Sequence, residues 1–172
     1  MASSSSNVDG DSNHQQQPQH QVFINFRGVQ LRLNFMSHLR KALERHGINM
    51  FIDTQELMGK DLENLLQRIK ESKIAIVVMS SRYTESKWCL NELVKIKECV
   101  EAGTLVVFPV FYKVDVRTLR EQRGTFGDNF RELVKLHPER EEPWKQALKF
   151  LANKTGKKAA VAAAVAATVS TF

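Results

Sequence analysis

The fold of the chain is decided around one stretch, Ser86-Lys87-Trp88-Cys89-Leu90-Asn91-Glu92-Leu93-Val94-Lys95-Ile96. An apolar run at residues 74–79 precedes it across a short polar link, and such a run is typical of a buried strand. Ser86 is a favourable N-cap, because its hydroxyl can accept from the first free amides of a helix. The order strand, loop, helix is the unit with which an open α/β sheet forms a ligand crevice at the carboxyl ends of its strands.

Helical spacing divides the side chains of this predicted helix into two groups. Five of them fall on one arc, which is expected to face inward: Leu90, Leu93, Val94, Lys97 and Val100. Trp88 and Glu92 are one turn apart and lie off that arc, on a common flank. An aromatic ring beside a carboxylate at the mouth of a crevice can hold a ligand made of a base and a sugar. The alternative is a solvated glutamate beside a half-buried tryptophan.

Length and composition favour one domain with a real core, because the chain has 172 residues of which 42% are hydrophobic. The net charge of +6 allows an acidic partner, which is a dinucleotide, a nucleic acid or an anionic membrane surface. Cys89 and Cys99 fall on the same predicted helix about 15 Å apart, too far for a disulfide, and this suits a reducing compartment. No secretory signal is evident at the N-terminus.

Strands and helices alternate along the chain. Apolar runs predict strands at residues 21–26, 48–52, 74–79 and 104–112, and Pro109 predicts an edge position, a bulge or a strand end because proline lacks the amide donor. Helical spacing predicts helices at residues 31–43, 62–69, 86–100, 126–136 and 144–153. The expected fold class is α/β, a flavodoxin-like three-layer sandwich with a mainly parallel central sheet.

Two tails flank the predicted domain, which covers residues 21–153. Residues 1–20 are polar and are expected to be disordered, because they have nothing to bury. Residues 154–172 are lysines followed by an Ala/Val-rich run, which is shorter than the roughly 20 apolar residues that span a bilayer. Membrane binding is therefore not expected.

Several short motifs recur in the order and spacing of one family. Besides the stretch at residues 86–96 they are Phe23-Ile24-Asn25-Phe26-Arg27-Gly28, Phe51-Ile52-Asp53, Ile74-Ala75-Ile76-Val77-Val78, Pro109-Val110-Phe111-Tyr112-Lys113-Val114-Asp115 and Gly124-Thr125-Phe126-Gly127. Together they resemble plant TIR (Toll/interleukin-1 receptor) domains. The resemblance implies a protein of the TIR-only type or a truncated receptor. Family members continue into one more short strand and a closing helix. Residues 154–172 depart from that pattern, so the last strand and helix are expected to be missing or altered.

The resemblance implies a chemistry and a set of residues. Glu92 matches the catalytic glutamate of the family, which acts on the bond between nicotinamide and ribose in NAD+. NAD+ is then a substrate, no cofactor is implied, and no metal is required because the leaving group is already a cationic pyridinium. Contacts to NAD+ are implied for Arg27, Gly28, Val29, Gln30, Leu31, Arg32, Gly59 and Trp88. A Ser37-His38 pair is similar to the self-association surface of the family.

One loop departs from the family pattern. The usual Arg-Gly-Glu-Asp-Thr-Arg is Arg27-Gly28-Val29-Gln30-Leu31-Arg32 here, which keeps both arginines and the glycine but loses the acidic pair and the threonine. Reduced activity is therefore expected. The arginines suit a pyrophosphate, since each can donate two parallel hydrogen bonds, and surface charge flanking a turn is the alternative.

The sequence leaves three functions open. The first is an NAD+ nucleosidase of plant innate immune signalling that works in a self-associated assembly. The second is a catalytically weak adaptor that binds other TIR-containing immune receptors. The third is nucleic-acid binding or cleavage, which ranks last because no basic stripe is interleaved with aromatic residues. The resemblance implies a cytoplasmic location, with the nucleus as a further possibility.

Overall fold

The computed structural model of the chain describes residues 22–28, 31–45, 50–52 and 62–154. The predictions about the N-terminal tail, and about the tail beyond Lys154, fall outside these residues. The same holds for the last strand and closing helix of the family pattern. All statements about the structure below refer to the described part of the chain.

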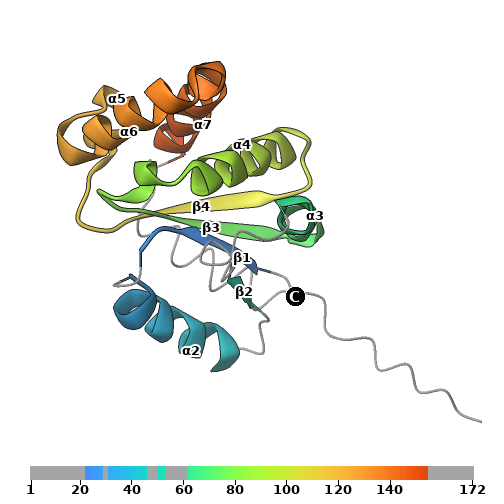
Figure 1. The fold of residues 1–172 in the computed structure, drawn as a ribbon. Coiled ribbons are helices and arrows are strands. Elements are labelled where there is room, and N and C mark those ends of the chain that lie inside the picture. Colours follow the sequence, from blue (N-terminus) through green and yellow to red (C-terminus); the bar gives the residue numbers. More distant parts are fainter. Residues whose placement is uncertain (1–21, 29–30, 46–49, 53–61, 155–172) are drawn as a thin grey trace, which may run out of the picture.

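The centre of the fold is a parallel four-stranded sheet with the order β2-β1-β3-β4 (Figure 1). Its strands are β1 (Val22–Phe26), β2 (Met50–Ile52), β3 (Ile74–Met79) and β4 (Val106–Phe111). The four predicted strands and their parallel arrangement are therefore confirmed. Pro109 lies in β4, at the edge of the described sheet, where a missing amide donor is tolerated.

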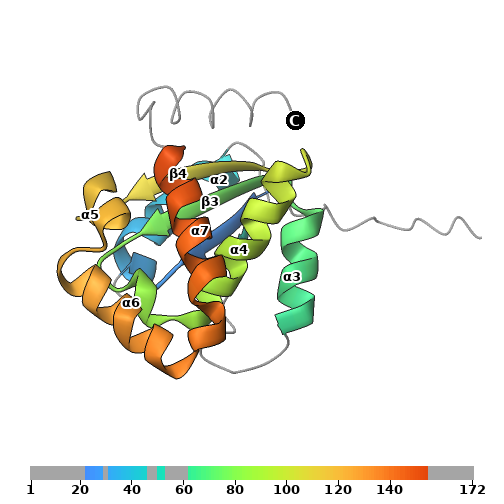
Figure 2. The same cartoon turned by 90° about the horizontal axis from the view of Figure 1, so that it is seen from above.

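Helices cover both faces of the sheet, as Figures 1 and 2 show. One face carries α2 (Ser37–Arg45), which continues from the short π-helix η1 (Arg32–Met36). The other face carries α3 (Leu62–Glu71) and α4 (Lys87–Glu101), with η3 (Tyr83–Glu85) directly before α4. A further group packs outside α4 and consists of α5 (Val116–Glu121), α6 (Gly124–Leu136), η4 (Pro138–Arg140) and α7 (Glu141–Asn153). The predicted three layers are present, with this group added.

The alternation of side chains along the strands builds a separate core on each face. Phe23 in β1 and Val77 in β3 pack on the side of α4 and α7. Ile24 and Phe26 in β1 pack on the opposite side, with Leu31 and Met36 of the η1 segment. Because the central strands are buried on both faces, they read as continuous apolar runs in the sequence.

The structure adds a helix that the sequence patterns did not predict. Residues 116–121, for which no helix was predicted, form α5. Asp115 caps this helix, because its carboxylate accepts from the Thr118 backbone amide at 2.8 Å. Leu119 anchors it in the core, and Gln122 ends it in the left-handed conformation. Two apolar residues in six, Val116 and Leu119, give too little periodicity to predict a helix.

Asn91 of α4 joins α7 to the rest of the fold. Its side-chain oxygen accepts from Trp144 Nε1 at 2.9 Å and from Arg140 Nη2 at 3.0 Å. Trp144 is buried against Phe130, so its indole N–H has no access to bulk water. This asparagine therefore satisfies a polar group that the core would otherwise leave unpaired.

We expect Asn91→Leu to lower the free energy of unfolding by about 1–3 kcal/mol, because it leaves the buried indole N–H of Trp144 without an acceptor. The corresponding fall in melting temperature is roughly 3–10 °C for a domain of this size, measured by circular dichroism. Asn91→Asp is the control, since it keeps the acceptor and faces Arg140. Equal melting temperatures for the leucine and aspartate variants would contradict this role.

Candidate active site

Ser86 begins α4 as predicted. Its hydroxyl accepts from the Cys89 backbone amide at 3.2 Å, and its backbone is extended, as at an ordinary N-cap. The predicted inward arc is only partly correct, because the buried residues of α4 are Cys89, Leu90, Glu92, Leu93, Ile96 and Cys99. Glu92 therefore faces the sheet. The prediction that it lies off the inward arc of the helix is wrong, and so is the alternative of a solvated glutamate.

The Glu92 carboxylate is held by a polar group near the carboxyl end of β1. Asn25 Nδ2 donates to Glu92 Oε2 at 2.6 Å and lies 3.3 Å from the Cys89 carbonyl. The Tyr83 hydroxyl donates to Asn25 Oδ1, and it also lies 3.0 Å from the Cys89 carbonyl. Glu92, Asn25 and Tyr83 are 2%, 1% and 0% exposed, so this network is inside the protein.

The network fixes the orientation of the Asn25 amide. A carboxylate only accepts hydrogen bonds, so the amide nitrogen must face Glu92 and the amide oxygen must face Tyr83. The Asn25 amide therefore has one possible orientation, and it holds the Glu92 carboxylate against the carboxyl end of β1. A rigid, hydrogen-bonded carboxylate at that edge of a parallel sheet is where an α/β fold places ligand chemistry.

Trp88 lies in the first turn of α4 and is half-buried. The Lys87 ammonium lies 5.4 Å from the centre of its ring, which is a cation–π distance. Part of the ring is thus exposed at the end of the helix that is nearest the carboxyl ends of the strands. Whether it stacks on a base stays a prediction.

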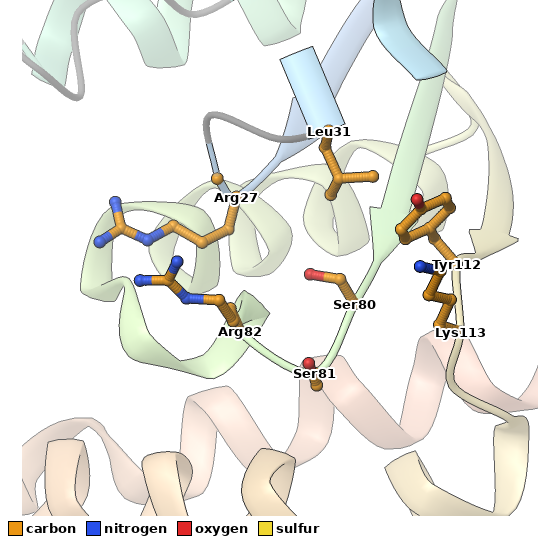
Figure 3. A pocket seen from close by; sticks show the side chains of 8 residues that line it. Arg27, Leu31, Ser80, Ser81, Arg82, Tyr112 and Lys113 are labelled. Atoms are coloured by element: carbon orange, nitrogen blue, oxygen red, sulfur yellow. The ribbon is translucent and has the colours of Figure 1, made fainter. Parts of the chain in front are cut away.

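A pocket of about 150 Å³ opens at the carboxyl ends of β1, β3 and β4 (Figure 3). Arg27, Gly28 and Leu31 of the predicted NAD+ contacts line it. Gly28 has a φ of 108°, a backbone conformation that favours glycine, and Leu31 is buried in the core between the sheet and η1. Glu92 and Trp88 are not among the residues that line this pocket.

Charge around the pocket is mainly positive. Arg82 and Lys113 line it together with Arg27. Glu85 partly neutralises them, because it lies 3.0 Å from Arg82 Nε and 3.9 Å from Arg27 Nε. The hydrogen bond to Glu85, with the attraction of its charge, raises the pKa of the Arg82 guanidinium above its ordinary value.

The remaining predicted site residues are distributed as follows. Val29, Gln30 and Gly59 lie outside the described residues. Arg32 is the first residue of η1, and Ser37 and His38 begin α2. The Ser37 hydroxyl donates to the Leu33 carbonyl at 3.1 Å, whereas His38 is exposed.

Three further features of the described residues bear on the kind of site. Among the described residues, no group of three or more His, Cys, Asp or Glu side chains is arranged to hold a metal ion. No helix in the described part of the chain has the length and apolar character needed to cross a membrane. Cys89 and Cys99 are both buried in α4 as thiols and form no disulfide with each other, as predicted.

The sequence analysis did not single out Asn25 or Tyr83, although one signal for Asn25 was available. Asn25 is the polar residue of an otherwise apolar strand, and a polar side chain in such a place needs a partner inside the protein. Tyr83 lies within the polar link between residues 79 and 86, and nothing in its sequence neighbourhood marks it as buried. Only the fold brings the two residues to Glu92.

Comparison with known proteins identifies the class. The family model of the TIR domain matches residues 19–168, which is most of the chain, so the chain belongs to the TIR domain family. The resemblance stated from the motifs is thereby confirmed. The flavodoxin-like fold is confirmed too, because the chain aligns with the TIR domains of the activated Roq1 resistosome that directly recognizes the pathogen effector XopQ. That alignment has a TM-score of 0.74 at 35% identity and covers 89% of this chain and 99% of that one.

Two curated relatives come from Arabidopsis thaliana. The disease resistance-like protein CSA1 is 56% identical over 157 residues, which make up 91% of this chain and 13% of that protein. The disease resistance protein RBA1 is 47% identical over 140 residues, 81% of this chain and 39% of that protein. The chain therefore spans only a small part of these relatives.

We expect a double-mutant cycle between Asn25→Ala and Glu92→Gln to show coupling. Asn25→Ala alone should lower the free energy of unfolding by about 2–3 kcal/mol, because it removes a hydrogen bond to a buried charge. In the Glu92→Gln background the loss should be smaller by about 1–2 kcal/mol, since the charge is gone. Urea unfolding of the four chains gives the coupling. Additive losses would show that the Asn25 amide does not stabilise the charged form of Glu92.

Proposed function

We propose that this TIR domain is an NAD+ nucleosidase of plant innate immune signalling, with Glu92 as the catalytic carboxylate. The observation that carries the proposal is the placement of Glu92: a carboxylate held inside the fold by Asn25, next to the carboxyl end of β1. Burying a carboxylate costs folding free energy, and an apolar side chain would pack in its place without that cost. A buried and positioned carboxylate of this kind is typical of a functional site.

The chemistry asked of Glu92 is the stabilisation of positive charge. Cleavage of the bond between nicotinamide and ribose leaves a cationic ribosyl ring and expels a neutral pyridine. A fixed carboxylate beside that ring stabilises the developing cation, and one that binds the ribose hydroxyls holds the sugar in the reactive orientation. The Asn25 amide leaves Glu92 few orientations, so little reorganisation is needed when the charge develops.

Assembly belongs to the proposal for two reasons. Gly59, which lies outside the described residues, matches a glycine of the family pattern, and in that pattern the segment around this glycine in one copy completes the pocket of the next. His38 is exposed near the start of α2, on the helix that covers the face of the sheet opposite α4 (Figure 1). Self-association through Ser37 and His38 therefore leaves Glu92 on the other side of the sheet unobstructed.

We expect Glu92→Gln to lower nicotinamide release from NAD+ by about a hundredfold or more, because the amide keeps the shape of the side chain but lacks the charge that stabilises the ribosyl cation. Release is measured with purified protein at high concentration. Glu98→Gln is the matched control, since Glu98 is an exposed glutamate of the same helix, paired with Lys95. Unchanged release by the Glu92 variant would exclude the catalytic role.

A second prediction concerns assembly. Specific nicotinamide release should rise steeply with protein concentration, and His38→Ala should shift that rise severalfold toward higher concentration by weakening the contact between copies. Lys70→Ala, a change of an exposed residue on α3, should leave the curve in place. A specific activity that is independent of protein concentration would contradict the need for assembly.

One observation favours a second candidate function, a TIR adaptor that binds other TIR-containing immune receptors. Glu92 is only 2% exposed, and it does not line the pocket that Arg27 and Gly28 share. The replacement of the family's Glu-Asp-Thr by Val29-Gln30-Leu31 points the same way. An adaptor would show no difference between the parent chain and Glu92→Gln in nicotinamide release, while both would still bind a second TIR domain.

A further inference from the structure

We infer that the pocket at the carboxyl ends of β1, β3 and β4 is a binding site for a phosphoryl group, with Ser80 and Lys113 as ligand-contacting residues. Neither residue was among the predicted site residues. The site does not depend on the proposed cleavage of NAD+, because Glu92 does not line it. The proposed function enters only in naming the dinucleotide as one of two sources of the phosphate.

The first observation is a polar atom without a protein partner. Ser80 directly follows β3 and is 7% exposed. Its hydroxyl has no hydrogen-bond partner in the described part of the chain, although buried hydroxyl groups are normally paired. Ser80 lines the pocket, and Figure 3 shows its oxygen pointing toward the side on which the two guanidinium groups lie. A ligand oxygen in the pocket would satisfy it.

The second observation is the charge of the lining. Arg27, Arg82 and Lys113 line the pocket, and none of the described residues that line it is acidic. In the view of Figure 3 both arginines lie on one side of Ser80 and Lys113 lies on the other. Glu85 offsets one of the three positive charges. The net excess, around a space of about 150 Å³, suits one compact anion and is too small for a whole dinucleotide.

The third observation is the position of the pocket in the topology. Strand β1 has β2 on one side and β3 on the other, so the chain reverses its direction of winding between β1 and β3. Ligands of open α/β sheets bind at such a point, outside the carboxyl ends of the strands. Gly28 follows β1 there with a φ of 108°, a conformation that lets a backbone amide approach an anion.

The backbone conformation of Lys113 indicates that this lysine serves binding and not the stability of the fold. Its φ is 54°, in the left-handed region that glycine and asparagine adopt more readily than lysine. Its ammonium lies 5.3 Å from the centre of the Tyr112 ring. A lysine in this backbone conformation contributes its charge to the pocket at a conformational cost, and an asparagine would remove both.

The test measures the binding of inorganic phosphate to the full chain by 31P NMR titration. We use the Glu92→Gln background so that added NAD+ is not consumed. Ser80→Ala and Lys113→Asn should each weaken phosphate binding roughly tenfold, since each removes one hydrogen bond to a charged ligand. Neither should lower the melting temperature, because the Ser80 hydroxyl makes no bond within the described protein and asparagine suits the backbone of residue 113. Lys135→Asn, the same change of charge on α6, should bind phosphate as the parent does.

The same titration distinguishes the two sources of the phosphoryl group. Competition between phosphate and NAD+ would assign the pocket to the pyrophosphate of the dinucleotide. Simultaneous binding of both would assign it to a separate phosphate-bearing effector. The inference is overturned if the parent chain binds no phosphate at millimolar concentration, or if Ser80→Ala and Lys113→Asn bind it as tightly as the parent. Nicotinamide release by Glu92→Gln would refute the proposed catalytic role and leave these binding results unaffected.

Discussion

The hydrogen bond from Asn25 to Glu92 is the contact on which the organisation of the site depends. It joins the central strand β1 to α4, and it does so inside the core, where an unpaired carboxylate would be costly. Tyr83 holds the other end of the same amide, so the loop that precedes α4 is tied to the same point. Strand, loop and helix are therefore fixed to one another by polar groups that can bond in only one way.

This constraint explains why α4 keeps a glutamate on its inward face. The buried residues Cys89, Ile96 and Cys99 fall on the same side of the helix as Glu92, and the adjoining side chains are apolar. Cys89 also contributes its backbone carbonyl to the network, since the amide of Asn25 lies 3.3 Å from it. A carboxylate in this setting is expensive for stability and well suited to a chemical role, which is the physical basis of the proposed function.

The strands could be predicted well from the sequence. A strand that is buried on both faces of the sheet has apolar residues at successive positions, as residues 74–79 do. The sequence also predicted the cap at Ser86, because an N-cap depends only on residues that are neighbours in the sequence. It placed Glu92 off the inward face of the helix, because that face was identified from the arc that includes Leu90 and Val100. A glutamate is also rarely buried. The sequence missed Ser80, Tyr83 and Lys113 as site residues, because only the assembled sheet brings the ends of β1, β3 and β4 together.

Glu92 is not among the residues that line the pocket at the carboxyl ends of β1, β3 and β4, and this limits what a shared ligand can be. Side chains alternate along β1, so Asn25 reaches the α4 face while Phe26 packs toward η1, where Leu31 lines the pocket. A ligand that contacts both Glu92 and Ser80 must therefore cross the carboxyl end of β1 at Gly28. Such a ligand must be extended, with a neutral or cationic end near the carboxylate and an anionic part among the arginines. A nicotinamide dinucleotide has that polarity, and free phosphate meets only half of it.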